Sequence, residues 1–473
     1  MKRTKSNLSN YKLTTMDMGT LNPVQMQEVL PGDTMQLSTS ALVRVSPMLA
    51  PVMHPCTVRF HHWFVPSRLL WEGWEDFITG GPDNQNADTI PKFTIPADAE
   101  NGVLDYMGVP PVADLEVNEL PLRAYNMIYN EFYRDQDLQE ERLENDNTIA
   151  NVSWRKDYFT TARPWAQKGA DLSLPIGTSA PIVGSGLTTS NIDPVQVGPT
   201  GQSLSSQSPQ TTEQVFTTEA GTFEADLTQA TGVTANQFRE FFALQRYAEA
   251  RATYGSRYSE YLRYLGVKPS DARLQRPEYL GGGKSNLQFS EVLQTASDVT
   301  ENTPVGTLRG HGITAVKTRK NRRFFEEHGY VITLMSVVPK SIYQDGMHRS
   351  WLRNDKEDFF QKELQNIGQQ KVLQGEVDAK VPTTINDTFG YSDRYADYTS
   401  TPSTVSAEFR DLLNYWHLAR EFETPPDLND EFVSCNPSKR IFAEQTQHSL
   451  WCMVNNSVIA RRMVKKTQIG KIQ

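Results

Sequence analysis

The stretch CTVRFHHWFVPSRLLWEGWEDFITGG, residues 56–81, begins with the pattern of a β-strand. Apolar side chains recur at every second position, at Cys56, Val58 and Phe60. The basic side chain of Arg59 falls between them, on the other face. A period of two is typical of a strand that buries one face, and the Pro-Ser pair that follows ends the run. The stretch therefore predicts a strand followed by a loop.

The same stretch contains residue types that metal sites and aromatic binding sites use. His61 and His62 are adjacent, so on a strand their side chains point to opposite faces and are poorly placed to bind one metal ion. Trp63, Trp71 and Trp74 fit packing in a core or a subunit interface better than stacking on a base. We therefore predict no metal site here, and we take the three tryptophans as candidate subunit-interface residues.

Other segments extend the pattern on both sides. GYVITLMSVVP, residues 329–339, is apolar on both faces, as in a central strand between two layers. HSLWCMVNNSVIARRMV, residues 448–464, predicts one or two more strands, with a break at the Asn-Asn pair. Helical periodicity occurs at 120–136, 235–267 and 407–422. Strands near both ends with helices between them predict a mainly β fold class, an antiparallel β-sandwich with long helical and loop insertions.

One internal segment differs sharply in composition from the rest. Residues 178–233 are rich in Ser, Thr, Gly, Gln and Pro and contain no lysine or arginine. Such a segment can bury little apolar surface and is predicted to be a long exposed insertion. It divides the chain into residues 1–177, the polar surface insertion 178–233, and residues 234–473.

The charge of the chain is unevenly distributed. The net charge is −9, but the two ends of the sequence carry nine positive charges and no acid, so the remaining residues sum to −18. An acidic body with two basic ends is typical of ends that contact phosphate, although solubilising tails have the same composition. The candidate nucleic-acid-binding residues are Lys2, Arg3, Lys5, Lys12, Arg461, Arg462, Lys465, Lys466 and Lys471.

The sequence gives little support to an enzyme. YLGGGKSN, residues 279–286, lacks the first glycine of a phosphate-binding loop, so we interpret it as a flexible turn. No catalytic serine, cysteine or zinc motif occurs, and no carboxylate pair of a carbohydrate-active enzyme can be named. We predict no catalytic residue and no cofactor.

The cysteines and apolar runs indicate the compartment. Cys56, Cys435 and Cys452 are odd in number and widely spaced, which predicts free thiols in a reducing cytoplasm. No secretory signal and no long apolar run occurs, so we expect a soluble protein that does not insert into a membrane.

Five segments carry a resemblance to a known family. In chain order they are residues 56–81, DYFTTARPWAQKGADLSLPIG (157–177), RYSEYLRYLGVKPSDARLQRPEYLGG (257–282), EHGYVITLMSVVPKSIYQDGMHR (327–349) and FGYSDRYADYTSTPSTVSAEFR (389–410). Together they resemble the major capsid protein of microviruses, small icosahedral bacteriophages with circular single-stranded DNA, and the gokushovirus-like branch in particular. The resemblance covers about residues 15–175 and 235–460.

The resemblance implies an eight-stranded antiparallel jelly roll with large insertions and no enzymatic activity. It further implies self-association into a T=1 icosahedral shell of sixty copies in the virion, assembled in the cytoplasm of the bacterial host. Implied partners are the single-stranded DNA genome, a small basic DNA-packaging protein, a pilot protein, a scaffolding protein and a bacterial host receptor. The insertion at 178–233 falls where relatives build a threefold protrusion, and an alternative role for it is a host-receptor-binding module.

Overall fold

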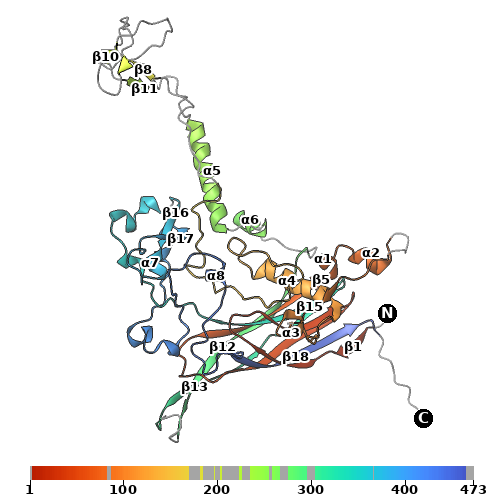
Figure 1. Ribbon diagram of the computed structural model, residues 1–473. Helices are drawn as coiled ribbons and strands as arrows, with labels where there is room; N and C mark the ends of the chain where they lie inside the picture. Colours follow the sequence, from red (N-terminus) through yellow and green to blue (C-terminus); the bar gives the residue numbers. More distant parts are fainter. Residues whose placement is uncertain are drawn as a thin grey trace, which may run out of the picture. The chain divides into compact units, whose positions relative to one another are not determined.

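The computed structural model describes residues 3–81, 87–97, 99–169, 235–254, 258–266, 275–295, 304–365 and 367–464, together with four short strands between residues 182 and 225 (Figure 1). The chain divides into two compact units, one made of residues 1–168 with 249–473 and the other of residues 169–248.

Ten of the described strands form one antiparallel sheet. In chain order they are β1 (Thr4–Asn7), β2 (Asn10–Met16), β3 (Asn22–Val29), β4 (Thr34–Val45), β5 (Cys56–Pro66), β12 (Glu278–Leu293), β13 (Leu308–Lys317), β14 (Asn321–Phe324), β15 (Gly329–Pro339) and β18 (Leu450–Arg462). Their spatial order is β1-β18-β4-β13-β12-β5-β15-β3, with β2 also paired to β18 and β14 to β4.

Eight of these strands pair in a nested order. β2 pairs with β18, β3 with β15, β4 with β13, and β5 with β12, so the first strand meets the last and the middle two meet each other. A long hairpin rolled up in this way is a jelly roll, with the four-stranded halves β2-β18-β4-β13 and β3-β15-β5-β12. β12 also pairs with β13, which joins the halves into one curled sheet. The mainly β, jelly-roll prediction is confirmed.

The inner faces of the two halves share a hydrophobic core. Val43 of β4, Val58 of β5, Val316 of β13, Met335 of β15 and Val454 of β18 belong to one buried cluster. Both halves contribute to it, as in two sheets packed face to face. β5 and β15 also bury side chains on their outer faces, and all eleven residues of β15 are buried. The prediction of a central strand at 329–339 is thus confirmed.

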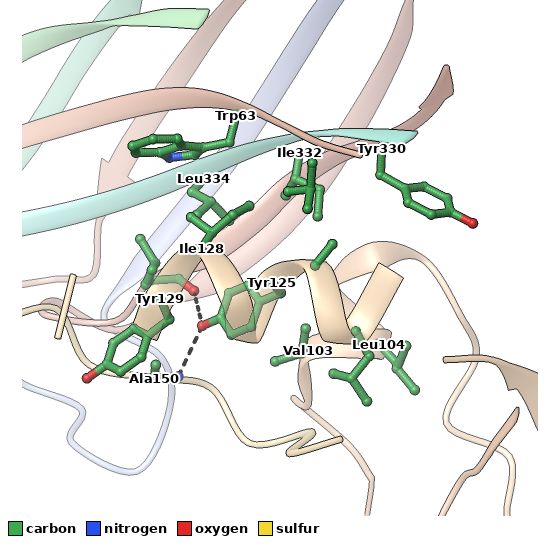
Figure 2. Packing of buried hydrophobic residues seen from close by; sticks show 14 of the residues in the cluster. Trp63, Val103, Leu104, Tyr125, Ile128, Tyr129, Ala150, Tyr330, Ile332 and Leu334 are labelled. Atoms are coloured by element: carbon green, nitrogen blue, oxygen red, sulfur yellow. Dashed lines mark hydrogen bonds between the residues drawn. The ribbon is translucent and has the colours of Figure 1, made fainter. Parts of the chain in front are cut away.

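A second core covers the outer face of β5 and β15. α4 (Leu120–Phe132) buries its apolar side chains there, among them Tyr125 and Ile128, against Trp63, Ile332 and other residues of the strands (Figure 2). The Tyr125 hydroxyl donates to the carbonyl oxygen of Leu21 at 2.8 Å and accepts from the backbone N–H of Ala150 at 3.2 Å. α4 thus ties the strand pair to the loop before β3 and the loop after the helix.

Polar side chains are also buried between the two halves. His62 Nδ1 lies 2.8 Å from the Thr333 hydroxyl, and His62 Nε2 lies 3.3 Å from the Thr318 hydroxyl. Thr333 in turn donates to Gln25 Oε1 at 3.2 Å. Asn456 donates to Asn10 Oδ1 and to the Val24 carbonyl, each at 3.1 Å. These contacts join β5, β15, β3, β2 and β18, so each of these strands is held in one register.

Two long insertions leave the jelly roll. The one after β5 contains α1 (Ser67–Leu70), α2 (Trp74–Thr79), β6 (Lys92–Thr94), α3 (Val103–Met107), β7 (Glu116–Asn118), α4, α5 (Ala235–Tyr254) and α6 (Tyr258–Tyr264). The one after β15 contains β16 (Gln369–Leu373), α7 (Gln374–Val377), β17 (Thr388–Asp393), α8 (Asp430–Val433) and several 3-10 turns. The second insertion has a core of its own, which includes Tyr343, Phe389 and Phe432.

Two local predictions are wrong, and of the one or two strands predicted at 448–464 the structure has one. Residues 407–422 form the short 3-10 helices Ala407–Arg410 and Asn414–Trp416 instead of an α-helix, because the segment bonds to distant chain, for example from Met53 N–H to the Trp416 carbonyl. β18 runs through its Asn-Asn pair without a break, since Asn456 is buried and hydrogen-bonded. The glycine run at 281–283 belongs to strand β12 and is not a turn.

The unit 169–248 contains the short antiparallel pairs β8 (Ile182–Gly184) with β11 (Phe223–Ala225) and β9 (Gln196–Val197) with β10 (Ser203–Leu204), and the first part of α5. Most of the predicted insertion 178–233 lies outside the described residues.

Replacing Tyr125 by Phe tests the second core. The Tyr125→Phe variant leaves the Leu21 carbonyl and the Ala150 N–H in a buried site without their partner, so we expect the free energy of unfolding to fall by about 1–3 kcal/mol. Urea unfolding followed by tryptophan fluorescence measures the change. Tyr11→Phe is the matched control, because Tyr11 is 74% exposed. Equal stability of the two variants would contradict the role given to this hydroxyl.

Candidate nucleic-acid interface

The two basic ends of the described chain lie side by side. β1 pairs antiparallel with the last residues of β18 (Figure 1). The register of this pair places Lys5 directly opposite Arg461. Both side chains are exposed. Like charges directly opposite each other in a ladder repel, so this pair favours an anion nearby. The sequence predicted that each end is basic, but only the strand pairing brings them together.

A third basic segment, which the sequence reasoning missed, joins the two ends. Residues 317–323 read KTRKNRR and connect β13 to β14, and a run rich in Lys and Arg is itself a signal for nucleic-acid contact. β14 pairs with β4 on the side away from β18, and β4 pairs Thr34 with both Arg461 and Phe324. Because paired residues share a face, Lys5, Arg461 and Phe324 lie on one face of the sheet. We call the exposed cations here the basic surface: Arg3, Lys5, Arg319, Lys320, Arg322 and Arg461.

Arg3 is positioned by an aromatic ring on this face. Its guanidinium lies 5.0 Å from the centre of the Phe324 ring and donates to the Thr34 hydroxyl at 3.3 Å. Lys5, Arg319, Lys320, Arg322 and Arg461 have no ion-pair partner among the residues that the structure describes. The basic surface therefore has unneutralised positive charge to offer to phosphate groups.

Two of the candidate residues have other roles. Arg462 donates to the buried carboxylate of Asp33 at 2.9 and 3.0 Å and to the Glu28 carbonyl at 2.6 Å, so it holds the end of β18 in place. Lys12 turns inward, where its ammonium donates to the carbonyls of Tyr106 and Pro23. Burial lowers the pKa of Lys12 to about 8, opposed by the nearby carboxylate of Asp105. Lys2, Lys465, Lys466 and Lys471 lie outside the described residues.

Exposed aromatic and apolar side chains continue the same face of the sheet. β2 and β18 pair Leu13 with Met453 and Thr15 with Trp451. Leu13, Met453 and Trp451 are well exposed, as is Tyr11 farther along β2. A row of cations beside exposed aromatic rings is the combination that single-stranded nucleic acid needs, because cations bind its backbone and rings stack on its bases.

The predicted tryptophans and histidines take mainly structural positions. Trp63 is buried against the rings of Phe132 and Tyr133, while Trp71 and Trp74 are half-buried around Phe77. The subunit-interface role of the tryptophans stays a prediction, and Trp71 and Trp74 have more surface available for it than Trp63. Burial, followed by the charge of Arg59, lowers the pKa of His61 to about 4.

Other site chemistries find no support in the described part of the chain. There, no group of three or more His, Cys, Asp and Glu side chains is arranged to hold a metal ion. Cys56, Cys435 and Cys452 are buried free thiols, and burial raises the pKa of Cys56 and of Cys452 to about 12, so both stay protonated and unreactive. Within the same described ranges, we find no helix with the length and apolarity of a membrane span.

Comparison with known proteins agrees with a role in a virus particle. The family model described as capsid protein (F protein) matches residues 1–469. The chain belongs to this microvirus capsid protein family. The capsid protein VP1 of Bdellovibrio phage phiMH2K is 37% identical over 92% of this chain and 88% of its own length. VP1 of Chlamydia phage 1 is 33% identical over 96% of this chain and 92% of its own length. VP1 of Spiroplasma virus 4 is 30% identical over 91% of this chain and 87% of its own length.

This membership assigns the general role. The protein is the major capsid protein of a microvirus-like phage, a structural component of the virion and not an enzyme. As part of a multimeric shell, this capsid protein uses some of its exposed surface for contacts between copies.

Proposed function

We propose that this capsid protein assembles into a T=1 shell of sixty copies around a circular single-stranded DNA genome, and that the basic surface contacts that DNA. The observation that carries the proposal is the convergence of three separate basic segments on one face of the jelly roll. Exposed aromatic rings beside them favour a single-stranded partner. Assembly in the host cytoplasm fits the three free thiols.

The number of cations limits what the basic surface can do. Six cations in each of sixty copies give about 360 positive charges, whereas a genome of this class carries on the order of several thousand phosphates. The basic surface therefore tethers DNA to the wall and does not neutralise the genome. We propose that metal cations, polyamines or a small basic packaging protein supply most of the balance, alongside scaffolding and pilot proteins as further partners.

A triple variant tests the DNA contact. Lys5→Gln, Arg322→Gln and Arg461→Gln together remove three phosphate contacts but leave the structural ion pair of Arg462 with Asp33 intact. We expect weaker binding of oligothymidylate by the purified chain. The slope of log affinity against log salt should fall by about 2, since each phosphate contact on a single strand contributes about 0.7. Particles of the variant should hold less DNA or lose it at lower salt.

The matched control is Lys340→Gln, Lys362→Gln and Lys371→Gln, which removes three exposed cations elsewhere. If both triple variants change the salt slope equally, binding depends on net charge alone and the basic surface has no special role. If neither changes the slope or the DNA content of particles, the proposed contact is wrong.

A second candidate function concerns the insertion. We propose that residues 178–233, between the segments 1–177 and 234–473, form a surface module that protrudes at the threefold axes and contacts the host receptor. Residues 169–248 form a compact unit of their own, and the part of α5 in that unit exposes Phe238, Phe242 and Tyr247. Exposed aromatic side chains are enriched at contact surfaces.

Deleting residues 185–225 distinguishes receptor binding from assembly. Intact particles that no longer adsorb to host cells are the expected result for a receptor module, because the jelly-roll strands all lie outside the deletion. Sedimentation measures the yield of particles. In parallel, the number of plaque-forming units left in the supernatant measures adsorption. Loss of particles would assign the insertion to assembly, and normal adsorption would contradict the receptor role.

A further inference from the structure

Two adjoining cavities lie along β5 and β12, on the outer face of the β3-β15-β5-β12 half of the jelly roll. Their volumes are about 520 and 630 Å³, and Arg59, His61 and Arg155 line both. Tyr279 and Lys284 of β12 line only the 630 Å³ cavity, together with the glycines at 282 and 283. Volumes of this size are typical of sites for small ligands. We call Arg59, His61, Arg155, Tyr279 and Lys284 the β5–β12 cradle.

The cations of the cradle lack carboxylate partners. Lys284 lies directly opposite Arg59 in the ladder, where like charges repel. Burial, and after it the charge of the Arg155 guanidinium, lowers the pKa of Arg59. None of the three has an ion-pair partner in the described ranges of the chain. Three cations without an ion-pair partner in these ranges therefore converge along the two cavities.

Three acids line the 520 Å³ cavity, Asp135, Asp137 and Glu260, and other cations hold the two aspartates. Asp135 is bound by Lys156 and by Arg163, whose nitrogen lies 3.3 Å away. Burial opposes the ionisation of Asp135, but these two cations more than compensate and hold the pKa of its carboxyl below its usual range. Asp137 binds Lys168 at 2.7 Å. The two aspartates that line the 520 Å³ cavity are thus already neutralised by other cations.

A neutral histidine lines both cavities of the cradle. Trp63 Nε1–H donates to the Tyr133 hydroxyl at 3.3 Å, and that hydroxyl lies 2.6 Å from His61 Nδ1. Burial, followed by the charge of Arg59, lowers the pKa of His61 to about 4, so the ring is neutral near pH 7 and shares one hydrogen bond with the Tyr133 hydroxyl.

An exposed aromatic ring lies beside two glycines in the wall of the cradle. Tyr279 is 51% exposed, and its ring packs edge-on against His61 with 5.8 Å between ring centres. A Cβ on Gly282 would lie 2.0 Å from the Phe60 carbonyl oxygen and 2.9 Å from the Tyr279 hydroxyl. Only glycine allows β5, β12 and the Tyr279 side chain to approach this closely. The GGGKS motif thus shapes a concave, cationic surface without forming a phosphate loop.

We propose that the β5–β12 cradle binds a nucleoside phosphate, with the phosphate against Arg59, Arg155 and Lys284 and the base stacked on Tyr279. Cations beside a stacking ring bind this chemistry regardless of base identity. The ligand is either a nucleotide unit of a single strand or a free nucleotide. The cradle lies on the β3-β15-β5-β12 half, whereas the basic surface lies on the β1-β18-β4-β14 strands, so the two sites are tested separately.

Binding of three probes to the purified full chain tests the proposal. The probes are a labelled oligothymidylate of about ten nucleotides, thymidine monophosphate and inorganic phosphate. Arg155→Gln with Lys284→Gln removes two exposed cations, and Lys362→Gln with Lys371→Gln is the control with the same charge change. We expect the cradle double variant alone to weaken nucleotide binding about tenfold, and to lower the oligonucleotide salt slope by about 1.4. Tyr279→Leu should weaken both nucleotide probes but not inorganic phosphate.

The outcomes separate the possible sources of the ligand. If the cradle variants bind both thymidine monophosphate and the oligonucleotide more weakly, the ligand is a free nucleotide. If they bind only the oligonucleotide more weakly, the ligand is a nucleotide unit of a strand. Crosslinking of a 5-iododeoxyuridine oligonucleotide to Tyr279 is the independent measurement expected in the second case. If the cradle variants bind every probe like the control, the proposal is wrong. A defect confined to particle assembly also overturns it, because the cradle then receives a carboxylate of a second copy.

Failure here differs from failure of the DNA contact proposed above. The triple variant of the basic surface is measured beside the cradle variants with the same oligonucleotide. Loss of binding only in the basic-surface variant leaves the proposed function intact and removes the cradle. Loss of binding only in the cradle variants supports the cradle and contradicts the DNA contact of the basic surface.

Discussion

Strand β15 is buried on both faces, and the arrangement of the rest of the chain depends on that constraint. One face completes the core between the halves of the jelly roll, and the other face packs against α4. A strand that is apolar on both faces has no alternation to fix its register. The buried hydrogen bonds of Thr333 to His62 and Gln25 supply that register, because a shift of one residue would leave polar groups unpaired in the core. β3, β5 and the helical layer then follow from β15.

Sequence patterns predicted correctly those elements in which the apolar pattern of the segment matches the surfaces that tertiary packing buries. The strand at 56–66 and the helix at 120–132 have clear periodicities, the strand at 329–339 is apolar on both faces, and the fold buries the faces that these patterns indicate. The prediction was wrong where tertiary contacts override local preference. The helical pattern at 407–422 gives way to bonds with distant segments, and the glycine run becomes a strand because Gly282 must approach the Phe60 carbonyl. No local rule contains these contacts.

The candidate site was predictable in composition but not in geometry. Basic residues at both ends of the sequence were visible, yet their meeting depends on the pairing of β1 with β18, which is a long-range contact. The sequence also cannot separate Lys5, which is exposed, from Lys12, whose ammonium is turned inward. The basic run at 317–323 was visible as a pattern and completes the basic surface. The unpaired cations of the cradle depend on the register that sets Lys284 opposite Arg59, and no sequence signal shows that register.

The central claim is that the jelly roll presents its basic surface to the packaged DNA. A cryo-electron microscopy reconstruction of DNA-filled particles tests it most directly, because one map gives the copy number, the orientation of each jelly roll and the ordered nucleic acid. We expect sixty copies in a T=1 shell, with the strands β1, β18, β4 and β14 facing the interior and nucleic-acid density beside Lys5 and Arg461. A map in which these strands face the outside of the particle, or are covered by a neighbouring copy, would contradict the account.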